Sequence, residues 1–160
     1  SENYHTIDLL SDILGRSKSS RLTKALVDQN RIFSELNAYV TGSFDPGLLV
    51  ISGKLSEGRD FNEVDNGIDN ILSELISKGV TDREVEKVKN QAISSNAFGE
   101  IQLLNRAMNL AYFDLLGDPD LINQEEKKIK EVSAEKIMDE ASNILAKENS
   151  STLYYKAKNS

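Results

Sequence analysis

The residues that could carry chemistry in this chain are few, and each lacks the neighbours that the chemistry needs. The 160 residues include one histidine, His5, and no cysteine. A zinc site needs two or more histidine, cysteine or carboxylate ligands at suitable spacing, so we interpret His5 as a solvated side chain near a loose terminus. The same scarcity excludes a Ser-His-Asp triad and a cysteine nucleophile. We therefore assign no catalytic, metal-binding or substrate-binding residue to this chain.

Two polar clusters resemble binding motifs, but their surroundings favour plainer roles. Residues 15–20 (GRSKSS) resemble a phosphate-binding loop, yet the second glycine and the Gly-Lys-Ser/Thr ending are missing. We interpret them as a turn between two helices, with serines that cap the second helix. Glu125 and Glu126 precede Lys127 and Lys128. Acids before lysines on a helix indicate a solvated face that complements the helix dipole.

Composition excludes several classes of protein. The formal net charge is −7, whereas binding to nucleic acid requires clustered lysine and arginine. No apolar run approaches the roughly 20 residues that span a bilayer. A chain without cysteine suits either the cytoplasm or the periplasm, so the compartment stays open. The polar N-terminus lies close to the first helix, so we expect this chain to be a C-terminal fragment of a longer multi-domain protein.

The first third of the chain is predicted to form two helices and then two strands. Apolar residues recur at helical spacing over 7–14, and Gly15 follows where a left-handed C-cap is expected. Thr6 or Asp8 is a candidate N-cap of this helix. A second helix follows over residues 22–30. The serine-rich turn therefore lies between two helices.

From residue 32 the hydrophobic period changes to two, which predicts a strand over 32–41. The residues expected on one side of this strand are Ser34, Leu36, Ala38 and Val40. Asp45-Pro46-Gly47 predicts a turn, since proline fixes φ and glycine tolerates a positive φ. The apolar run 48–51 then predicts a strand covered on both faces and continuing to residue 55.

The remainder is predicted to be mainly helical. An apolar stripe over 61–76 ends at Gly79, and Thr81 with Glu84 forms a capping box for the next helix. Gly99 is a candidate break in that helix. Residues 101–116 are apolar on more than one face, so we expect them to form the most buried helix.

The last third is predicted to hold two more helices and a final strand. The Gly-Asp-Pro sequence at 117–119 ends the preceding helix. Asp120 and Ser133 are expected to cap the two helices that follow, and residues 152–156 are predicted to form a last strand. These elements predict one α+β domain over residues 1–160, with a small, mainly antiparallel sheet packed against several helices.

The order of several short motifs resembles the pitrilysin/insulinase-type zinc metallopeptidases, a family that includes the mitochondrial processing peptidases. Residues 10–15 (LSDILG), 19–22 (SSRL) and 26–27 (LV) are similar to its helix, turn and helix landmarks. Residues 78–89 are similar to its Gly-Val-Thr helix opening. Residues 116–119 and 132–137 resemble later landmarks, so the resemblance covers almost the whole chain.

The resemblance implies part of a LuxS/MPP-like metallopeptidase domain in a protein built as a clamshell of homologous domains around a peptide substrate. One domain of such proteins carries zinc in an HxxEH motif. A single histidine cannot supply that motif, so the resemblance implies a non-catalytic C-terminal domain without a cofactor of its own. Zinc and proteolysis would then belong to a homologous partner domain or subunit, and the substrate would be a peptide or unfolded protein.

One departure from the family pattern affects the expected function. Active members often carry an arginine and, seven residues later, a tyrosine that reach the substrate; here the matching positions are Val27 and Ser34. We therefore carry no substrate-binding role onto either residue. The leading hypothesis is a non-catalytic part of a peptidase chamber. The alternative is a structural or assembly domain of an inactive relative.

Overall fold

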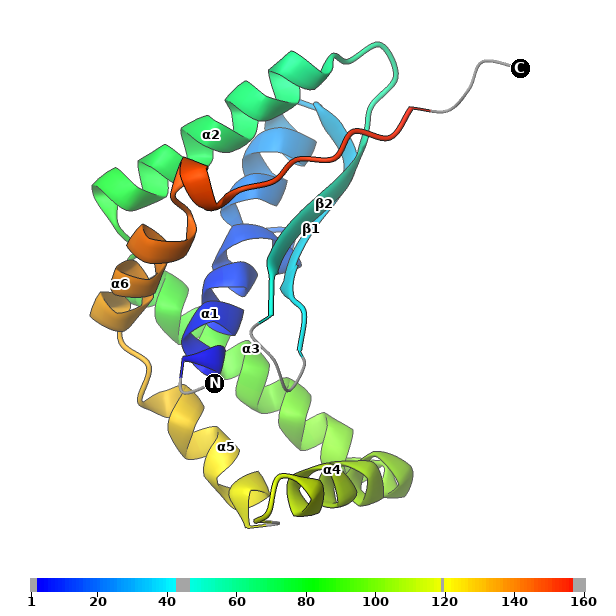
Figure 1. The fold of residues 1–160 in the computed structure, drawn as a ribbon, viewed down its shortest axis with the longest axis vertical. Coiled ribbons are helices and arrows are strands. Elements are labelled where there is room, and N and C mark those ends of the chain that lie inside the picture. Colours follow the sequence, from blue (N-terminus) through cyan, green and yellow to red (C-terminus); the bar gives the residue numbers. More distant parts are fainter. Residues whose placement is uncertain (1–2, 43–46, 119, 157–160) are drawn as a thin grey trace.

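A computed structural model describes residues 3–42, 47–118 and 120–156 and has an α+β architecture (Figure 1). In chain order the regular elements are α1 (Tyr4–Ser11), β1 (Phe33–Val40), β2 (Leu49–Leu55), α2 (Phe61–Lys78), α3 (Asp82–Ile101), α4 (Leu103–Leu115), α5 (Leu121–Lys130) and α6 (Ala134–Ile144). Two π-helical segments, Asp12–Arg16 and Thr23–Gln29, lie between α1 and β1, and a short 3-10 turn, Lys147–Asn149, follows α6. The predicted fold class is confirmed.

The sheet is one antiparallel pair of strands, with Ala38 opposite Ile51 and Val40 opposite Leu49. Leu36, Ala38 and Val40 face inward as predicted. Ser34 does not, because an irregularity in register between Phe33 and Glu35 turns Phe33 into the core and leaves Ser34 exposed. The expected turn at 45–47 falls partly on residues 43–46, which lie outside the described residues.

The prediction that β2 is covered on both faces is wrong. Leu48 is exposed, and Leu49, Val50 and Ile51 are only half-buried. In the described part of the chain β2 pairs with β1 alone, and the face that carries Leu49, Ile51 and Leu55 is the one that packs against the core.

The core lies between the hairpin and the helices that pack against one side of it. α1, the two π-helical segments and β1 contact one another, and α6 packs against α1. The most completely buried large side chains are Leu9, Leu10, Leu14, Leu22, Leu26, Leu75 and Ile137. Burying each leucine removes apolar surface worth roughly 2 kcal/mol from water, so the N-terminal helices anchor this fold.

Gly15 has a different role from the predicted C-cap. It lies inside the segment Asp12–Arg16, and its φ is not among the positive values found at Gly58, Gly79 and Gly117. A Cβ on Gly15 would lie 2.7 Å from both the Cβ and the backbone nitrogen of Ala38. Glycine is therefore required by a close helix–strand approach and not by a turn.

Three predicted helix ends, at Gly79, Thr81 and Ser133, are confirmed by their hydrogen bonds. Thr81 and Glu84 form the capping box of α3, and the Ser133 side chain accepts from the backbone N–H of Lys136. Asp120, in contrast, makes no side-chain cap, and neither Thr6 nor Asp8 caps α1, whose N-cap residue is Asn3. Gly79 ends α2 with a positive φ, whereas α3 continues through Gly99 to Ile101.

The prediction that residues 101–116 form the most buried helix is wrong. α4 contains no buried residue, because it lies at one end of the molecule and contacts mainly α3 and α5 (Figure 1). The predicted last strand is also not formed. Residues 151–156 are extended but pair with no strand in the described part of the chain. None of the helices described has the length and apolar content needed to cross a membrane.

Candidate functional site

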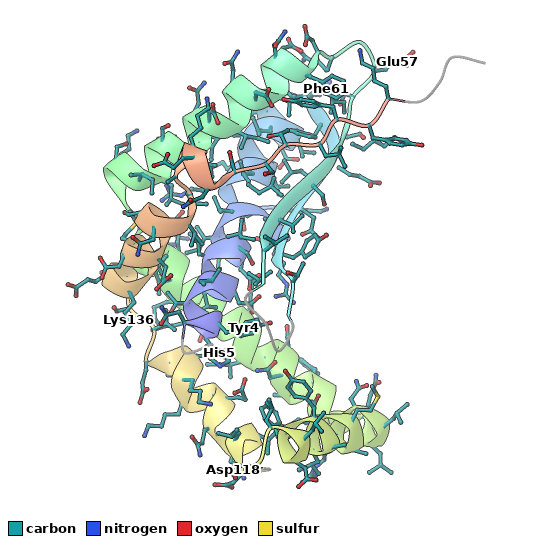
Figure 2. The ribbon with its side chains drawn as sticks, viewed as in Figure 1. Tyr4, His5, Glu57, Phe61, Asp118 and Lys136 are labelled. Atoms are coloured by element: carbon teal, nitrogen blue, oxygen red, sulfur yellow. The ribbon has the colours of Figure 1, made fainter. Side chains whose placement is uncertain are left out.

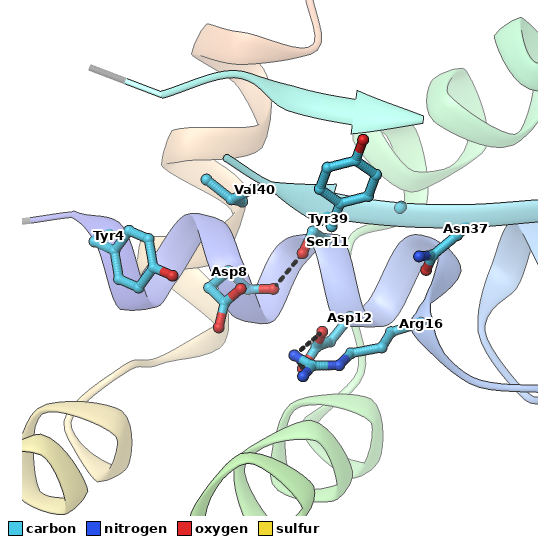
Figure 3. Close-up of a pocket in the computed structure, with 9 residues that line it drawn as sticks. Tyr4, Asp8, Ser11, Asp12, Arg16, Asn37, Tyr39 and Val40 are labelled. Atoms are coloured by element: carbon cyan, nitrogen blue, oxygen red, sulfur yellow. Dashed lines mark hydrogen bonds and ion pairs between the residues drawn. The ribbon is translucent and has the colours of Figure 1, made fainter. Parts of the chain in front are cut away.

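A hollow of about 360 Å³ lies between the first helix and the second half of β1. Figure 3 shows that its polar side chains come from two directions. Tyr4, Asp8, Asp12 and Arg16 project from one side of the helix, and Asn37 and Tyr39 project from the strand. The helix residues are spaced by four, so they form one polar stripe beside the apolar stripe that enters the core.

Asp12 is the most buried charged group of the hollow, with a side chain 4% exposed. Arg16 donates to it from Nη1, at 3.1 Å from Oδ1. Burial raises the pKa of the Asp12 carboxyl, and the hydrogen bond and positive charge of Arg16 offset part of this effect. The same pair raises the pKa of Arg16. Asp12 and Arg16 thus form an ion pair in the lining of the hollow.

Asp8 is the carboxylate without such a partner. Burial raises its pKa, while the charges of Arg16 and His5 act in the opposite direction. Ser11 donates to the backbone carbonyl of Asp8 at 2.7 Å, but no hydrogen bond reaches the Asp8 carboxylate from any residue that the structure describes. Burial also raises the pKa of the neighbouring Tyr4 phenol, and the charge of Asp8 adds to this effect. A ligand with a cationic or donor group would stabilise the ionised form of Asp8.

A second hollow of about 220 Å³ continues on the other side of the same helix and shares Tyr4, Asp8 and Arg16. His5 lies in it, with Nε2 3.4 Å from Oε2 of Glu125 and a side chain 17% exposed. Its imidazole meets the Tyr4 ring edge-on (Figure 2 labels both residues). His5 is therefore not the loose, solvated histidine that the sequence predicted.

Glu125 also departs from its predicted place on a solvated face. Burial acts to raise the pKa of its carboxyl, but the hydrogen bonds and charges of His5 and Lys128 outweigh that effect and leave the pKa below its usual value. Glu126, one residue later, pairs with Lys130 on the exposed face as expected. Contact between α1 and α5, which a helix-by-helix pattern cannot show, accounts for the difference.

Val27 and Ser34, the positions matched to the family's arginine and tyrosine, lie outside both hollows. Val27 is half-buried and packs against the core. Ser34 is exposed at the start of β1, where its hydroxyl donates to the backbone carbonyl of Lys54 at 3.1 Å. The structure does not bring either side chain into one site with Asp8.

The two hollows bring carboxylate, phenol and guanidinium groups of the first helix together. Among residues 3–42, 47–118 and 120–156, no three His, Asp or Glu side chains are grouped so as to hold a metal ion. No histidine lies beside a serine as a base, since His5 pairs with Glu125. The sequence did contain a signal for the hollow, namely the four-residue spacing of Tyr4, Asp8, Asp12 and Arg16. The apolar stripe alone predicted the helix.

Comparison with known proteins locates this fold in a family. Residues 1–92 match the family model described as the peptidase M16 inactive domain. No curated protein matches the chain at a significant level.

Three solved structures share the fold along most of the chain. A candidate zinc protease from Bordetella pertussis Tohama I is 23% identical with a TM-score of 0.80, over 93% of this chain and 82% of that one. The inactive peptidase domain of a candidate zinc protease from Bordetella parapertussis is 21% identical with a TM-score of 0.82, over 93% and 81%. A protease from Helicobacter pylori is 18% identical with a TM-score of 0.81, and the match spans 89% of this chain but 35% of that longer one.

Proposed function

This chain belongs to the peptidase M16 inactive domain family, and on that premise we propose that it forms the non-catalytic wall of a peptide chamber whose zinc and HxxEH motif lie in a separate, homologous domain or subunit. The observation that carries the proposal is the family match combined with a single histidine in 160 residues. Water activation by zinc requires several ligands and a general base, and the described residues hold no such group of ligands.

The hollow beside β1 is the surface that we assign to substrate contact. Asp8 is a half-buried carboxylate with a raised pKa and no hydrogen-bonding partner among the described residues, and the Tyr4 phenol lies next to it. Ionisable groups whose charged form is destabilised by burial occur preferentially at functional sites, where a ligand can replace the lost solvation. A lysine or arginine side chain of an unfolded peptide has the complementary charge.

Titration of the isotope-labelled chain with an unstructured, lysine-rich peptide tests this assignment. We expect amide shifts in α1 and in residues 37–40, and weaker binding by about tenfold for Asp8→Asn, because one charge-assisted contact is lost. Asp139→Asn is the matched control, since Asp139 is an exposed aspartate on α6. It should bind like the wild type.

Other outcomes would contradict the proposal. Shifts confined to α5 and α6 would place the binding surface elsewhere. Equal affinity for a glutamate-rich peptide of the same length would show that the Asp8 carboxylate does not select charge. Zinc-dependent cleavage of the peptide by this chain alone would overturn the non-catalytic assignment.

A second function, an assembly domain in an inactive relative, is favoured by Val27. This side chain is half-buried against the core, where an active member would present an arginine to substrate. If this second function is correct, the separate, homologous domain also lacks HxxEH. The isotope-labelled chain then binds neither the lysine-rich nor the glutamate-rich peptide. The presence or absence of HxxEH in the sequence of the separate, homologous domain, together with the peptide titration, distinguishes the two functions.

A further inference from the structure

α4 presents a large apolar surface that the rest of the described chain leaves open. Leu103 is 83% and Leu115 73% exposed, and Phe98 and Ile101 at the end of α3 are exposed as well. Figure 2 shows the side chains of this helix projecting from the end of the molecule farthest from α2. Exposed apolar patches of this kind on a folded protein mark interaction sites.

The exposed residues of α4 include two adjacent ridges with four-residue spacing. One ridge consists of Arg106, Leu110 and Asp114. The second ridge consists of Leu103, Ala107, Ala111 and Leu115. All seven side chains are exposed, and the half-buried residues of α4 are Asn105 and Phe113. Rows with this spacing pack into the grooves of another helix, and the two alanines allow a close approach.

The charges on the first ridge are self-complementary. Arg106 and Asp114 lie four residues before and four residues after Leu110, and they are the only charged residues of α4. Neither side chain has an ion-pair partner among the residues that the structure describes. When two copies of α4 cross antiparallel at Leu110, each Arg106 comes level with Asp114 of the other copy.

We propose that this face of α4 binds a second copy of the chain through an antiparallel, two-fold symmetric helix pair centred on Leu110. In this pair the leucine and alanine ridges bury one another, and two Arg106–Asp114 ion pairs fix the register. A two-fold contact requires a self-complementary surface, and the spacing of these opposite charges about one leucine meets that requirement. Antiparallel register with matched charges also disfavours the parallel arrangement, which would bring like charges level.

Sedimentation equilibrium of the whole chain at about 5–200 μM tests the proposal, with single and double charge reversals. We expect the wild type to dimerise. Arg106→Asp and Asp114→Arg should each weaken dimerisation by about tenfold or more, because each homodimer then contains two like-charge pairs. The double variant R106D/D114R should recover the wild-type affinity. An equimolar mixture of the two single variants should form a heterodimer more strongly than either forms a homodimer.

Asp139→Arg, which reverses an exposed charge on α6, is the control for net charge and should dimerise like the wild type. Circular dichroism of every variant verifies folding. A wild type that stays monomeric at 200 μM would overturn the proposal. The exposed face of α4 would then be a candidate contact for a different protein domain. Association that is polydisperse, or insensitive to the charge reversals, would overturn it as well. None of these outcomes bears on peptide binding beside β1, so the two proposals fail independently.

Discussion

Gly15 sets how closely the first helix approaches the sheet. Alanine is usually the better helix residue, by about 1 kcal/mol. At Gly15, however, a Cβ would meet backbone and side-chain atoms of Ala38 at 2.7 Å, and backbone atoms cannot give way as a flexible side chain can. Overpacking of this kind typically costs about 1–3 kcal/mol, so the clash outweighs the helix preference.

We therefore predict that Gly15→Ala lowers the free energy of unfolding by about 1–2 kcal/mol, measured by urea denaturation. Gly99→Ala in α3 is the matched control, because no atom lies within 4 Å of a Cβ placed there. That substitution should raise stability by up to about 1 kcal/mol through helix preference alone. Equal effects of the two substitutions would show that the approach to Ala38 is not tight.

Arg21 links two motifs that the sequence places 63 residues apart. Its Nε and Nη2 donate to the two carboxylate oxygens of Glu84 at 2.8 and 2.9 Å, and Nη2 also donates to the carbonyl of Gly79 at 2.8 Å. Glu84 in turn accepts from the backbone N–H of Thr81 at 2.9 Å. The serine-rich turn is thereby held against the start of α3. The Arg21 hydrogen bond, together with those from Thr81, outweighs partial burial and lowers the pKa of Glu84 from 4.5 to about 2.

This shift predicts a pH dependence of stability. A carboxyl whose pKa is lower in the folded state stabilises the fold above its unfolded pKa of 4.5, and the stabilisation is lost as the pH falls toward 2. Because the Glu84 side chain is 31% exposed, solvent screening reduces the effect to about 1–2 kcal/mol. In urea denaturation, the gap between the wild type and Glu84→Gln should be constant above pH 5 and close near pH 2.

Glu57→Gln is the control for this pH series, because Glu57 is an exposed acid with no ion-pair partner in the described chain. Its stability curve should follow the wild type at every pH. If the curves of the wild type and Glu84→Gln instead stay parallel down to pH 2, the Arg21–Glu84 interaction does not contribute to folding.

At the scale of elements, the C-terminal segment 151–156 lies on α2 without joining the sheet. The Tyr154 hydroxyl donates to the Asp65 carboxylate, and its ring packs on Phe61 with centroids 4.6 Å apart. The Lys156 ammonium lies 5.3 Å from the centroid of the same Phe61 ring. Side-chain contacts to one helix therefore replace the backbone pairing that holds an ordinary strand.

Tyr154→Ala is expected to release this segment without unfolding the rest. Heteronuclear NOE values of residues 152–156 should fall toward those of a mobile terminus, while values in α2 and β1 stay unchanged. Tyr155→Ala is the matched control, since the Tyr155 side chain is exposed and should leave the segment in place. A fall in both variants would show that backbone contacts, and not Tyr154, hold the segment.

At the scale of the whole molecule, the family match and the single histidine lead us to predict that this chain does not bind zinc by itself. His5 is engaged by Glu125 at 3.4 Å, and the described residues offer no third ligand nearby. We predict less than about 0.1 equivalent of zinc in metal analysis after dialysis, unchanged in His5→Ala. Stoichiometric zinc that is lost in His5→Ala would contradict this prediction.

Local patterns alone determined much of the fold. The capping box at Thr81 and Glu84, the Ser133 cap and the end of α2 at Gly79 were all predicted correctly, because each depends on backbone groups within a few residues. Alternation along β1 was predicted except at Ser34, where the irregularity in register reverses it. Motif order, together with the histidine count, also led to the family and its non-catalytic character.

Tertiary structure decided the features that depend on contacts between distant residues. Gly15 faces Ala38, and His5 reaches Glu125 across 120 residues of sequence; neither partner is visible from the segment itself. Asp8 and Asp12 line one hollow because β1 lies beside their side of the helix. The apolar residues of α4 predicted burial, whereas the arrangement of the described elements leaves them exposed. The sequence shows which side chains are apolar and favour burial. Only the arrangement of elements in space determines which surface shields each of them from water.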